Sequence, residues 1–183
     1  YIAAVCTELT DSIICGNNKP YFNEYTYVMN ATLKRVKFIN NKSKYTLVRF
    51  GNGATTVRSK LYDCEFINNS VDAKSRGLFT IYQYDPGADM YRCKFIGNTV
   101  SDGPIMSLNN HTVNHCIFAD NNCKDILYMP NDYGGLSTVR NTLMVNNTVK
   151  RNVIRKEAKN ASSALEIENV TIAHNTSSGA ECA

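Results

Sequence analysis

The chain has 183 residues, 20% of them charged, and a formal net charge of +4, with Lys and Arg scattered among Asp and Glu. This mild, dispersed charge gives no electrostatic footprint for nucleic acid, so no nucleic-acid partner is expected. No stretch approaches the run of about 18 apolar residues that a transmembrane helix needs, so no membrane span is expected within this segment.

Short apolar stretches alternate with polar turns along the chain, and no window keeps a helical apolar spacing for long. One set of strands is predicted at residues 25–29, 45–50, 78–84, 104–108, 126–129 and 153–155. A second set surrounds Phe38, Phe66 and Phe95, where a charged residue alternates with apolar ones, as in Cys64-Glu65-Phe66. That alternation is typical of a strand with one buried face.

The stretch Leu61–Asn69 recurs along the chain. Counted from Phe66, it has an apolar residue five places before, a small residue two before and an Asn three after. The same pattern is anchored at Ile14, Phe38, Phe66, Phe95, Phe118, Met144 and Ile172, with steps of 24, 28, 29, 23, 26 and 28 residues. Asn makes up 23 of the 183 residues, so finding it at all seven positions indicates a true repeat. A period of this size predicts a solenoid.

Strands that recur at this interval stack on their own copies in parallel. We therefore predict an all-β fold, a right-handed parallel β-helix of about seven coils with 23–29 residues and two strands per coil. Residues 1–183 form a single array in this interpretation. Because no polar capping repeat closes either end, we expect the array to be part of a longer protein.

The repeat predicts three inward-facing columns. Asn tolerates the left-handed conformation at a turn, and its amide can donate to the Asn of the next coil, while the neighbouring rings exclude water. The Asn ladder contains Asn17, Asn41, Asn69, Asn98, Asn121, Asn147 and Asn175. The core stack contains Phe38, Phe66, Phe95, Phe118, Met144 and Ile172. The small column contains Val36, Cys64, Cys93, Cys116, Thr142 and Val170.

The seven cysteines allow two interpretations. In the small column, thiols replace Val and Thr and are expected to be buried, although a disulfide between stacked coils is the alternative. Cys6, Cys15, Cys123 and Cys182 lie outside that column and are better candidates for bridges. The spacings match no zinc pattern and the three His are far apart, so no metal or other cofactor is indicated.

Surface features favour a secreted or cell-surface protein. Eight Asn-x-Ser/Thr sequons are present, and two of them, at Asn41 and Asn175, fall in the ladder. The remaining glycosylation candidates are Asn30, Asn68, Asn110, Asn146, Asn160 and Asn169. Candidate contact residues near the variable-length loops are Tyr82, Tyr84, Tyr128 and Tyr133, unless these rings pack under their own loops.

The motif Phe-x-x-Asn appears as Phe38-Ile-Asn-Asn41, Phe66-Ile-Asn-Asn69, Phe95-Ile-Gly-Asn98 and Phe118-Ala-Asp-Asn121. It resembles the repeat of chlamydial polymorphic outer-membrane proteins and of related adhesin-like proteins on some parasitic protists and archaea. The resemblance implies a right-handed β-helix that serves as a surface stalk or adhesin. It carries over no catalytic residues.

The main functional hypothesis is a structural or adhesive module that binds a protein or glycan ligand, or neighbouring copies of itself. One alternative is an intracellular component of a large filament or cytoskeletal assembly, with unused sequons. Another is a polysaccharide lyase or glycosidase, which needs carboxylates about 5 to 9.5 Å apart. Asp63 and Glu65 are instead expected to face Arg92 and Lys94 in the next coil, so catalysis is not the expected function.

Overall fold

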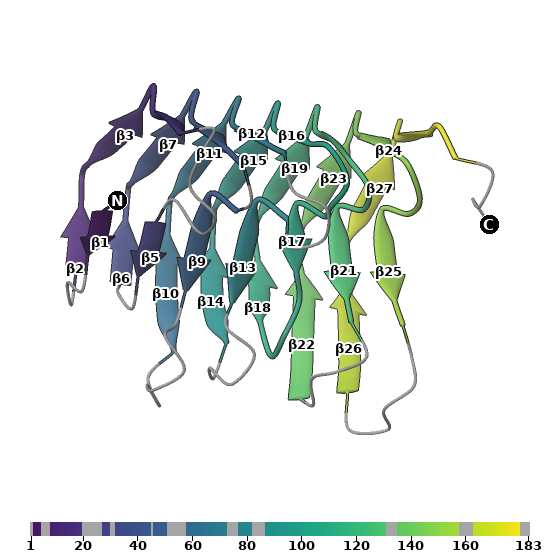
Figure 1. Cartoon of the computed structure of the whole chain (residues 1–183). Helices are drawn as coiled ribbons and strands as arrows, with labels where there is room; N and C mark the ends of the chain where they lie inside the picture. Colours follow the sequence, from purple (N-terminus) through teal and green to yellow (C-terminus); the bar gives the residue numbers. More distant parts are fainter. Residues whose placement is uncertain are drawn as a thin grey trace.

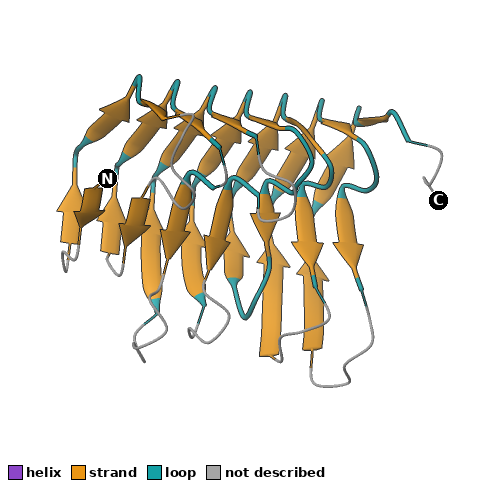
Figure 2. Cartoon of the chain, in the orientation of Figure 1, coloured by secondary structure: helices purple, strands orange, loops and turns teal. Residues whose placement is uncertain are grey.

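The computed structural model describes residues 2–4, 8–19, 27–29, 32–44, 46–50, 58–72, 77–81, 87–130, 135–157 and 163–179. These residues form a parallel β-solenoid without a helix, as Figures 1 and 2 show. Four parallel sheets run along the rod, each with seven strands. The prediction of an all-β parallel solenoid is therefore confirmed.

The chain visits the four sheets in the same order in each coil, and we name them sheets A to D. Sheet A contains β1 (Ile2–Ala4), β5 (Tyr27–Met29), β9 (Val48–Phe50), β13 (Phe79–Ile81), β17 (Met106–Ser107), β21 (Leu127–Met129) and β25 (Ile154–Lys156). Sheet B contains β2 (Glu8–Thr10), β6 (Thr32–Lys34), β10 (Ser59–Tyr62), β14 (Ala88–Tyr91), β18 (Thr112–Asn114), β22 (Gly135–Arg140) and β26 (Ser163–Glu168). Sheet C contains β3 (Ile13–Cys15), β7 (Lys37–Ile39), β11 (Glu65–Ile67), β15 (Lys94–Ile96), β19 (Ile117–Ala119), β23 (Leu143–Val145) and β27 (Thr171–Ala173). Sheet D contains β4 (Asn18–Lys19), β8 (Lys42–Ser43), β12 (Ser70–Val71), β16 (Thr99–Val100), β20 (Asn122–Cys123), β24 (Thr148–Val149) and β28 (Thr176–Ser177).

Equivalent residues of the repeat pair directly across neighbouring strands. Phe66 in β11 pairs with Phe38 and with Phe95. Leu61 in β10 pairs in the same way with Leu33 and Met90. Because of this register, equivalent residues form columns along the rod. Residues that face inward in one coil therefore face inward in the next.

The prediction of two strands per coil is wrong, because each coil contributes four. The strands predicted at residues 104–108, 126–129 and 153–155 overlap those of sheet A. The stretch Leu61–Asn69, however, holds the end of β10 and all of β11, and it leads into β12. A turn at Asp63 separates the first two of these strands, so they belong to different sheets.

Left-handed residues form two corners in each coil, and the ladder Asn residues are not among them. The corner between sheets B and C holds Asp11, Arg35, Asp63, Arg92, His115, Asn141 and Asn169, with φ between 47° and 56°. The corner between sheets C and D holds Gly16, Asn40, Asn68, Gly97, Asp120, Asn146 and His174. The prediction that the ladder Asn itself makes this turn is wrong by one position, because the residue before it has the positive φ. The preceding residue turns the chain at the surface, and the Asn side chain then points inward.

The core consists of side chains stacked along the rod axis. The rings of Phe38, Phe66, Phe95 and Phe118 stack with centroids 4.7–4.9 Å apart and interplanar angles of 5° or less. Met144 continues this column and is buried. Ile172, predicted in the same core stack, is 50% exposed because no described strand follows it in sheet C.

Candidate functional site

The Asn column forms a directional ladder inside the rod. Asn98 donates from its backbone N–H and from Nδ2 to Oδ1 of Asn121, at 2.9 and 3.0 Å. Its Nδ2 also donates to the carbonyl oxygen of Phe66 in the preceding coil, at 2.8 Å. The same three bonds recur at Asn41, Asn69, Asn121 and Asn147. These buried amides are fully used in holding coils together, so they offer nothing to a ligand.

The small column holds its thiols away from water. Cys64, Cys93 and Cys116 are buried, and each Sγ lies within hydrogen-bonding distance of backbone carbonyl oxygens. Hydrogen bonds that the Cys93 thiol donates to the two neighbouring sulfurs, together with burial, raise the pKa of Cys93 well above its usual value. Cys123 is also buried, whereas Cys15 is exposed, and all five of these cysteines are free. Cys6 and Cys182, the other bridge candidates, lie outside the described residues.

Ion pairs between successive coils lie on the outer face of the described rod. Arg92 forms an ion pair with Asp63 at 2.7 Å, and both Lys37 and Lys94 contact Glu65, at 3.0 and 3.3 Å. The hydrogen bond from Arg92 lowers the pKa of Asp63. A carboxylate held between cations stays ionised and is a poor general acid. The carboxylates considered as an acid–base pair therefore serve cross-strand pairing.

A group of interacting polar side chains outside the Asn ladder lies near sheet A. Asp125 is fully buried in the turn before β21 and accepts hydrogen bonds from Arg155 Nε at 3.1–3.2 Å and from the Asn152 N–H at 3.2 Å. The Arg155 guanidinium lies 3.9 Å over the ring of Tyr128 and also contacts Glu157. Burial and a hydrogen bond to Glu157, at 2.7 Å, raise the pKa of Tyr128 to about 12. Each member of this group already has a partner within the chain.

His111 is, after Asp125, a second buried ionisable residue whose burial the sequence did not predict. It is fully buried in the column that also contains Ser59, Ala88 and Ser137, and its backbone N–H donates to Ser137 Oγ at 3.2 Å. Neither ring nitrogen has a hydrogen-bond partner among the described residues. Burial lowers the pKa of this imidazole to about 4. His111 is therefore neutral at physiological pH.

The predicted surface residues lie in different settings. Asn68, Asn146 and Asn169 are exposed at left-handed corners. Asn110 is half-buried, and a Cβ built on Gly87 would lie 1.9 Å from its carbonyl oxygen. Outside the described residues lie Asn30, Asn160, Tyr82, Tyr84 and Tyr133. Their roles as glycosylation or contact sites remain predictions, as does that of the half-buried Tyr128.

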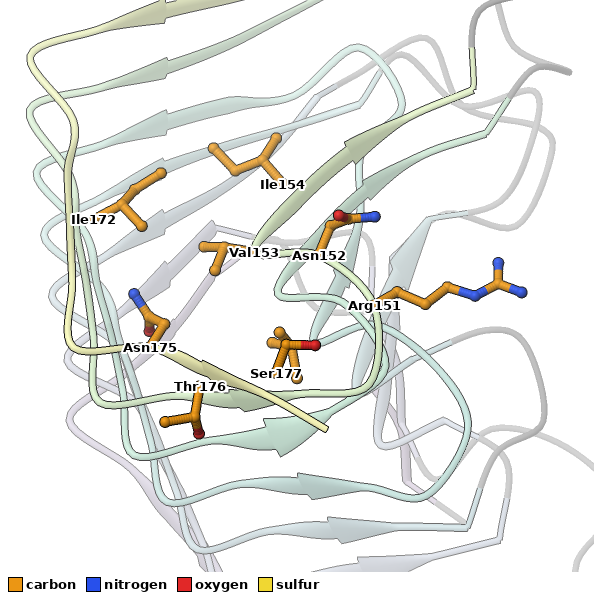
Figure 3. Close-up of a pocket in the computed structure, with 9 residues that line it drawn as sticks. Arg151, Asn152, Val153, Ile154, Ile172, Asn175, Thr176 and Ser177 are labelled. Atoms are coloured by element: carbon orange, nitrogen blue, oxygen red, sulfur yellow. The ribbon is translucent and has the colours of Figure 1, made fainter. Parts of the chain in front are cut away.

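A cavity of about 320 Å³ opens inside the last described coil. Figure 3 shows Val153, Ile154 and Ile172 around it, with Asn175 at one side, whereas Arg151 extends away. The apolar residues of its lining belong to columns that form the core elsewhere in the rod, as Val149, Val153 and Ile154 do. The cavity lies at the end of the described part of the core.

Comparisons with protein-family models, with curated protein sequences and with solved structures find no match to this chain. In the described part of the chain, no group of three or more His, Cys, Asp or Glu residues is arranged to hold a metal ion. Nor does any helix among those residues have the length and apolar character to cross a membrane.

Two features described above, the contact between Asp125 and Arg155 and the burial of His111, had a weak or absent signal in the sequence. Asp125 and Arg155 are 30 residues apart, more than any step of the repeat, so they occupy different columns and a column alignment does not pair them. His111 shares its column with Ser and Ala, which gives no apolar pattern to mark the position as inward. The stacked rings of Tyr62 and Tyr91, 5.4 Å apart on the outer face of sheet B, were detectable because they occupy one column of the repeat.

Proposed function

We propose that this chain is a non-catalytic structural and adhesive module, a right-handed β-helix of seven coils whose variable loops contact a protein or glycan partner. The observation that carries the proposal is that the inward and outward residues of each repeat have separate structural roles. The recurring inward residues pack or hydrogen-bond to their equivalents in the next coil, and recurring outward charges pair along the rod. Few of the recurring residues therefore remain available to bind a partner.

The segments that differ most between coils connect sheet A to sheet B. They fall between β9 and β10, β13 and β14, β21 and β22, and β25 and β26. Because those strands are stacked in register, the ends of the connections come together along one edge of the rod, which Figure 1 shows. Such a line of variable segments on a rigid support is how repeat proteins commonly build a binding surface.

A surface location fits the resemblance to chlamydial polymorphic outer-membrane proteins and related adhesin-like proteins. We propose that the protein is extracellular or attached to a cell surface, with glycans at exposed sequons such as Asn68, Asn146 and Asn169. Intact-mass analysis of native material tests this. Added glycan mass supports the location, whereas unmodified sequons favour an intracellular assembly component.

Binding to a printed array of sialylated, sulfated and neutral glycans, and adhesion of coated beads to cultured epithelial cells, test the adhesive role. A variant with Tyr82→Ser, Tyr84→Ser and Tyr133→Ser is expected to lose binding. The matched control exchanges the exposed sheet D residues Thr99 and Thr148 for Ser and is expected to bind normally. Equal binding by both variants would exclude the loops as the contact surface.

The enzyme alternative has a separate test. Calcium-dependent release of unsaturated sugars from a pectin-like polymer would show lyase chemistry and would contradict a purely adhesive role. No release is expected, because the carboxylates Asp63, Glu65 and Asp89 are each paired with a cation.

A further inference from the structure

The outer face of sheet C carries an aliphatic column along the middle of the rod. From the second to the sixth coil, the last residue of each sheet C strand points outward and is aliphatic, and we call this column the sheet C strip. It consists of Ile39, Ile67, Ile96, Ala119 and Val145, which pair in register. The four larger residues are half-buried, Ala119 is 9% exposed, and none of the five belongs to the packed core.

The sheet C strip lies within the internal coils of the rod. In β7, β11, β15, β19 and β23, the strand and the corners on both of its sides fall inside described ranges. The strip therefore does not depend on the first or last coil. Figure 1 shows sheet C on the side of the rod away from the edge where sheets A and B meet. A partner on the strip would leave that edge free.

Charges beside the sheet C strip change sign from coil to coil. In the neighbouring outward column, Lys37, Glu65 and Lys94 follow one another, and Glu65 contacts both lysines. At the adjoining corner, Asp63 pairs with Arg92 of the next coil. The third coil thus presents two acids beside the strip, and the fourth coil presents two bases.

This charge pattern is complementary to a second copy that runs in the opposite direction. We consider a two-fold axis parallel to the strands that passes between the third and fourth coils. Rotation about this axis sets Glu65 opposite the partner's Lys94 and Asp63 opposite the partner's Arg92. The symmetry repeats both contacts, so four pairs of opposite charges face each other.

The same rotation packs the sheet C strip on itself. Ile67 then faces the partner's Ile96, and Ile39 faces the partner's Ala119. Moving the axis onto the third or the fourth coil would instead set Glu65 or Lys94 against its own copy. Rods that run in the same direction would place the charged column of each copy over the strip of the other, which buries charge against aliphatic side chains. The antiparallel arrangement between the third and fourth coils avoids both penalties.

We propose that sheet C packs on sheet C of a second copy in this register, which gives a closed two-fold dimer with antiparallel rods. Six overlapping coils about 4.8 Å apart, with five residues of about 3.3 Å across the face, give a contact of roughly 500 Å² on each copy. Such an interface lies at the small end of specific contacts, so we expect a dissociation constant on the order of 10 μM. The inference goes beyond the loop contacts proposed above and does not depend on them.

A glycan at Asn68 and this contact exclude each other. Asn68 lies at the corner directly after Ile67 and would face the partner's Gly97 at the rim of the dimer. The dimer therefore forms from chains in which this sequon is unoccupied, and a chain glycosylated at Asn68 is expected to stay monomeric. Expression in bacteria supplies the unmodified chain for the tests.

Sedimentation equilibrium over a wide range of protein concentration measures the association. The wild-type chain is expected to pass from monomer to dimer and to form nothing larger. Ile96→Glu places a charge in the aliphatic contact and is expected to weaken dimerisation about 100-fold. The matched control Thr99→Glu lies in the same coil, on the exposed outer face of sheet D, and is expected to dimerise like the wild type. Circular dichroism shows whether each variant is folded.

Exchanging the charges tests the register. Glu65→Lys and Lys94→Glu each set like charges opposite each other, so each variant alone is expected to dimerise about tenfold more weakly than the wild type. An equimolar mixture of the two should regain the wild-type strength, because every contact between positions 65 and 94 across the dimer then joins opposite charges. The chain that carries both changes should also dimerise like the wild type.

Four outcomes would overturn the proposal. These are a wild-type chain that stays monomeric at about 1 mM, an assembly larger than a dimer, equal weakening by Ile96→Glu and Thr99→Glu, and a charge-exchange mixture that associates no better than its separate components. The mixture remains decisive if Ile96→Glu does not fold.

Discussion

Asn98 donates both its backbone N–H and its side-chain Nδ2 to a single atom, Oδ1 of Asn121, at 2.9 and 3.0 Å. One amide oxygen thus satisfies two donors of the neighbouring coil inside the buried core. The removal of one such side chain leaves polar groups unpaired on both sides of it, which makes the ladder sensitive to substitution.

We expect Asn98→Ala to lower the free energy of unfolding by about 3 kcal/mol. The variant would leave the Asn69 donors without their acceptor and would remove the hydrogen bond from Asn98 Nδ2 to the Phe66 carbonyl oxygen. Urea denaturation followed by circular dichroism measures the change. Asn17→Ala is the matched control at the half-buried end of the ladder, and we expect it to cost about 1 kcal/mol or less. Equal costs at the two positions would contradict this account of the buried ladder.

His111 is expected to make the fold sensitive to acid. The folded chain holds the imidazole neutral down to about pH 4, while the unfolded chain protonates it near 6.5, so the unfolded state binds more protons as the pH falls. The free energy of unfolding therefore decreases as the pH falls from 6.5 to about 4. The total decrease caused by His111 is about 3 kcal/mol below pH 4. His111→Leu should therefore lose less stability than the wild type between pH 7 and pH 4.

Urea titrations of both proteins across this pH window give the comparison. Carboxylates that titrate in acid are common to the two proteins and cancel. His115→Leu, at an exposed corner, serves as the control and should follow the wild type. If His111→Leu shows the wild-type pH dependence, the ring is not the group that limits stability in acid.

The cysteines should divide into two classes of reactivity. Cys15 is exposed and should react with N-ethylmaleimide in the native protein, whereas Cys64, Cys93, Cys116 and Cys123 are buried and should react only after unfolding. Burial withholds access to all four thiols, and the raised pKa of Cys93 also keeps that thiol protonated. Peptide mapping by mass spectrometry reads the modified positions. Rapid native labelling at Cys93 would contradict the packing of the small column.

Arg155 forms a buried ion pair with Asp125, and we expect its removal to destabilise the fold. Arg155→Leu would leave the fully buried carboxylate of Asp125 without its cation, and we expect a loss of about 3 kcal/mol in the free energy of unfolding. Asp125→Asn combined with Arg155→Leu should cost less than the sum of the two single changes. Urea denaturation of the four proteins gives this cycle. Additive costs would show that the two charges do not depend on each other.

Much of the fold could be predicted because one residue type repeats in each column. The Phe and Asn columns revealed the period, and the period implied parallel, in-register stacking, which the pairing of Phe66 with Phe38 and Phe95 shows. The opposite charges of Asp63 and Arg92 occupy one column and pair as expected. Columns carry this information because each coil contacts mainly its two neighbours.

The features that were missed break the column pattern. The corner between sheets B and C was hidden because Arg35, Arg92 and His115 adopt positive φ there, and these residue types do not usually mark a turn. Without that corner, the strands of sheet B were not predicted as separate elements. The contact between Asp125 and Arg155 joins two different columns, which depends on the geometry of the turn between sheets D and A. The exposure of Ile172 depends on its position at the end of the stack.

The direction of the hydrogen bonds between coils also has a mechanical consequence. These bonds run along the rod, and each coil is held mainly by its two neighbours, so tension applied to the two ends of the chain loads the terminal coil first. That coil would peel away before the next one bears the load. Each rupture releases one repeat of 23–29 residues, or about 80–100 Å of extended chain. Pulled from its ends, the rod should lengthen in a series of nearly equal steps.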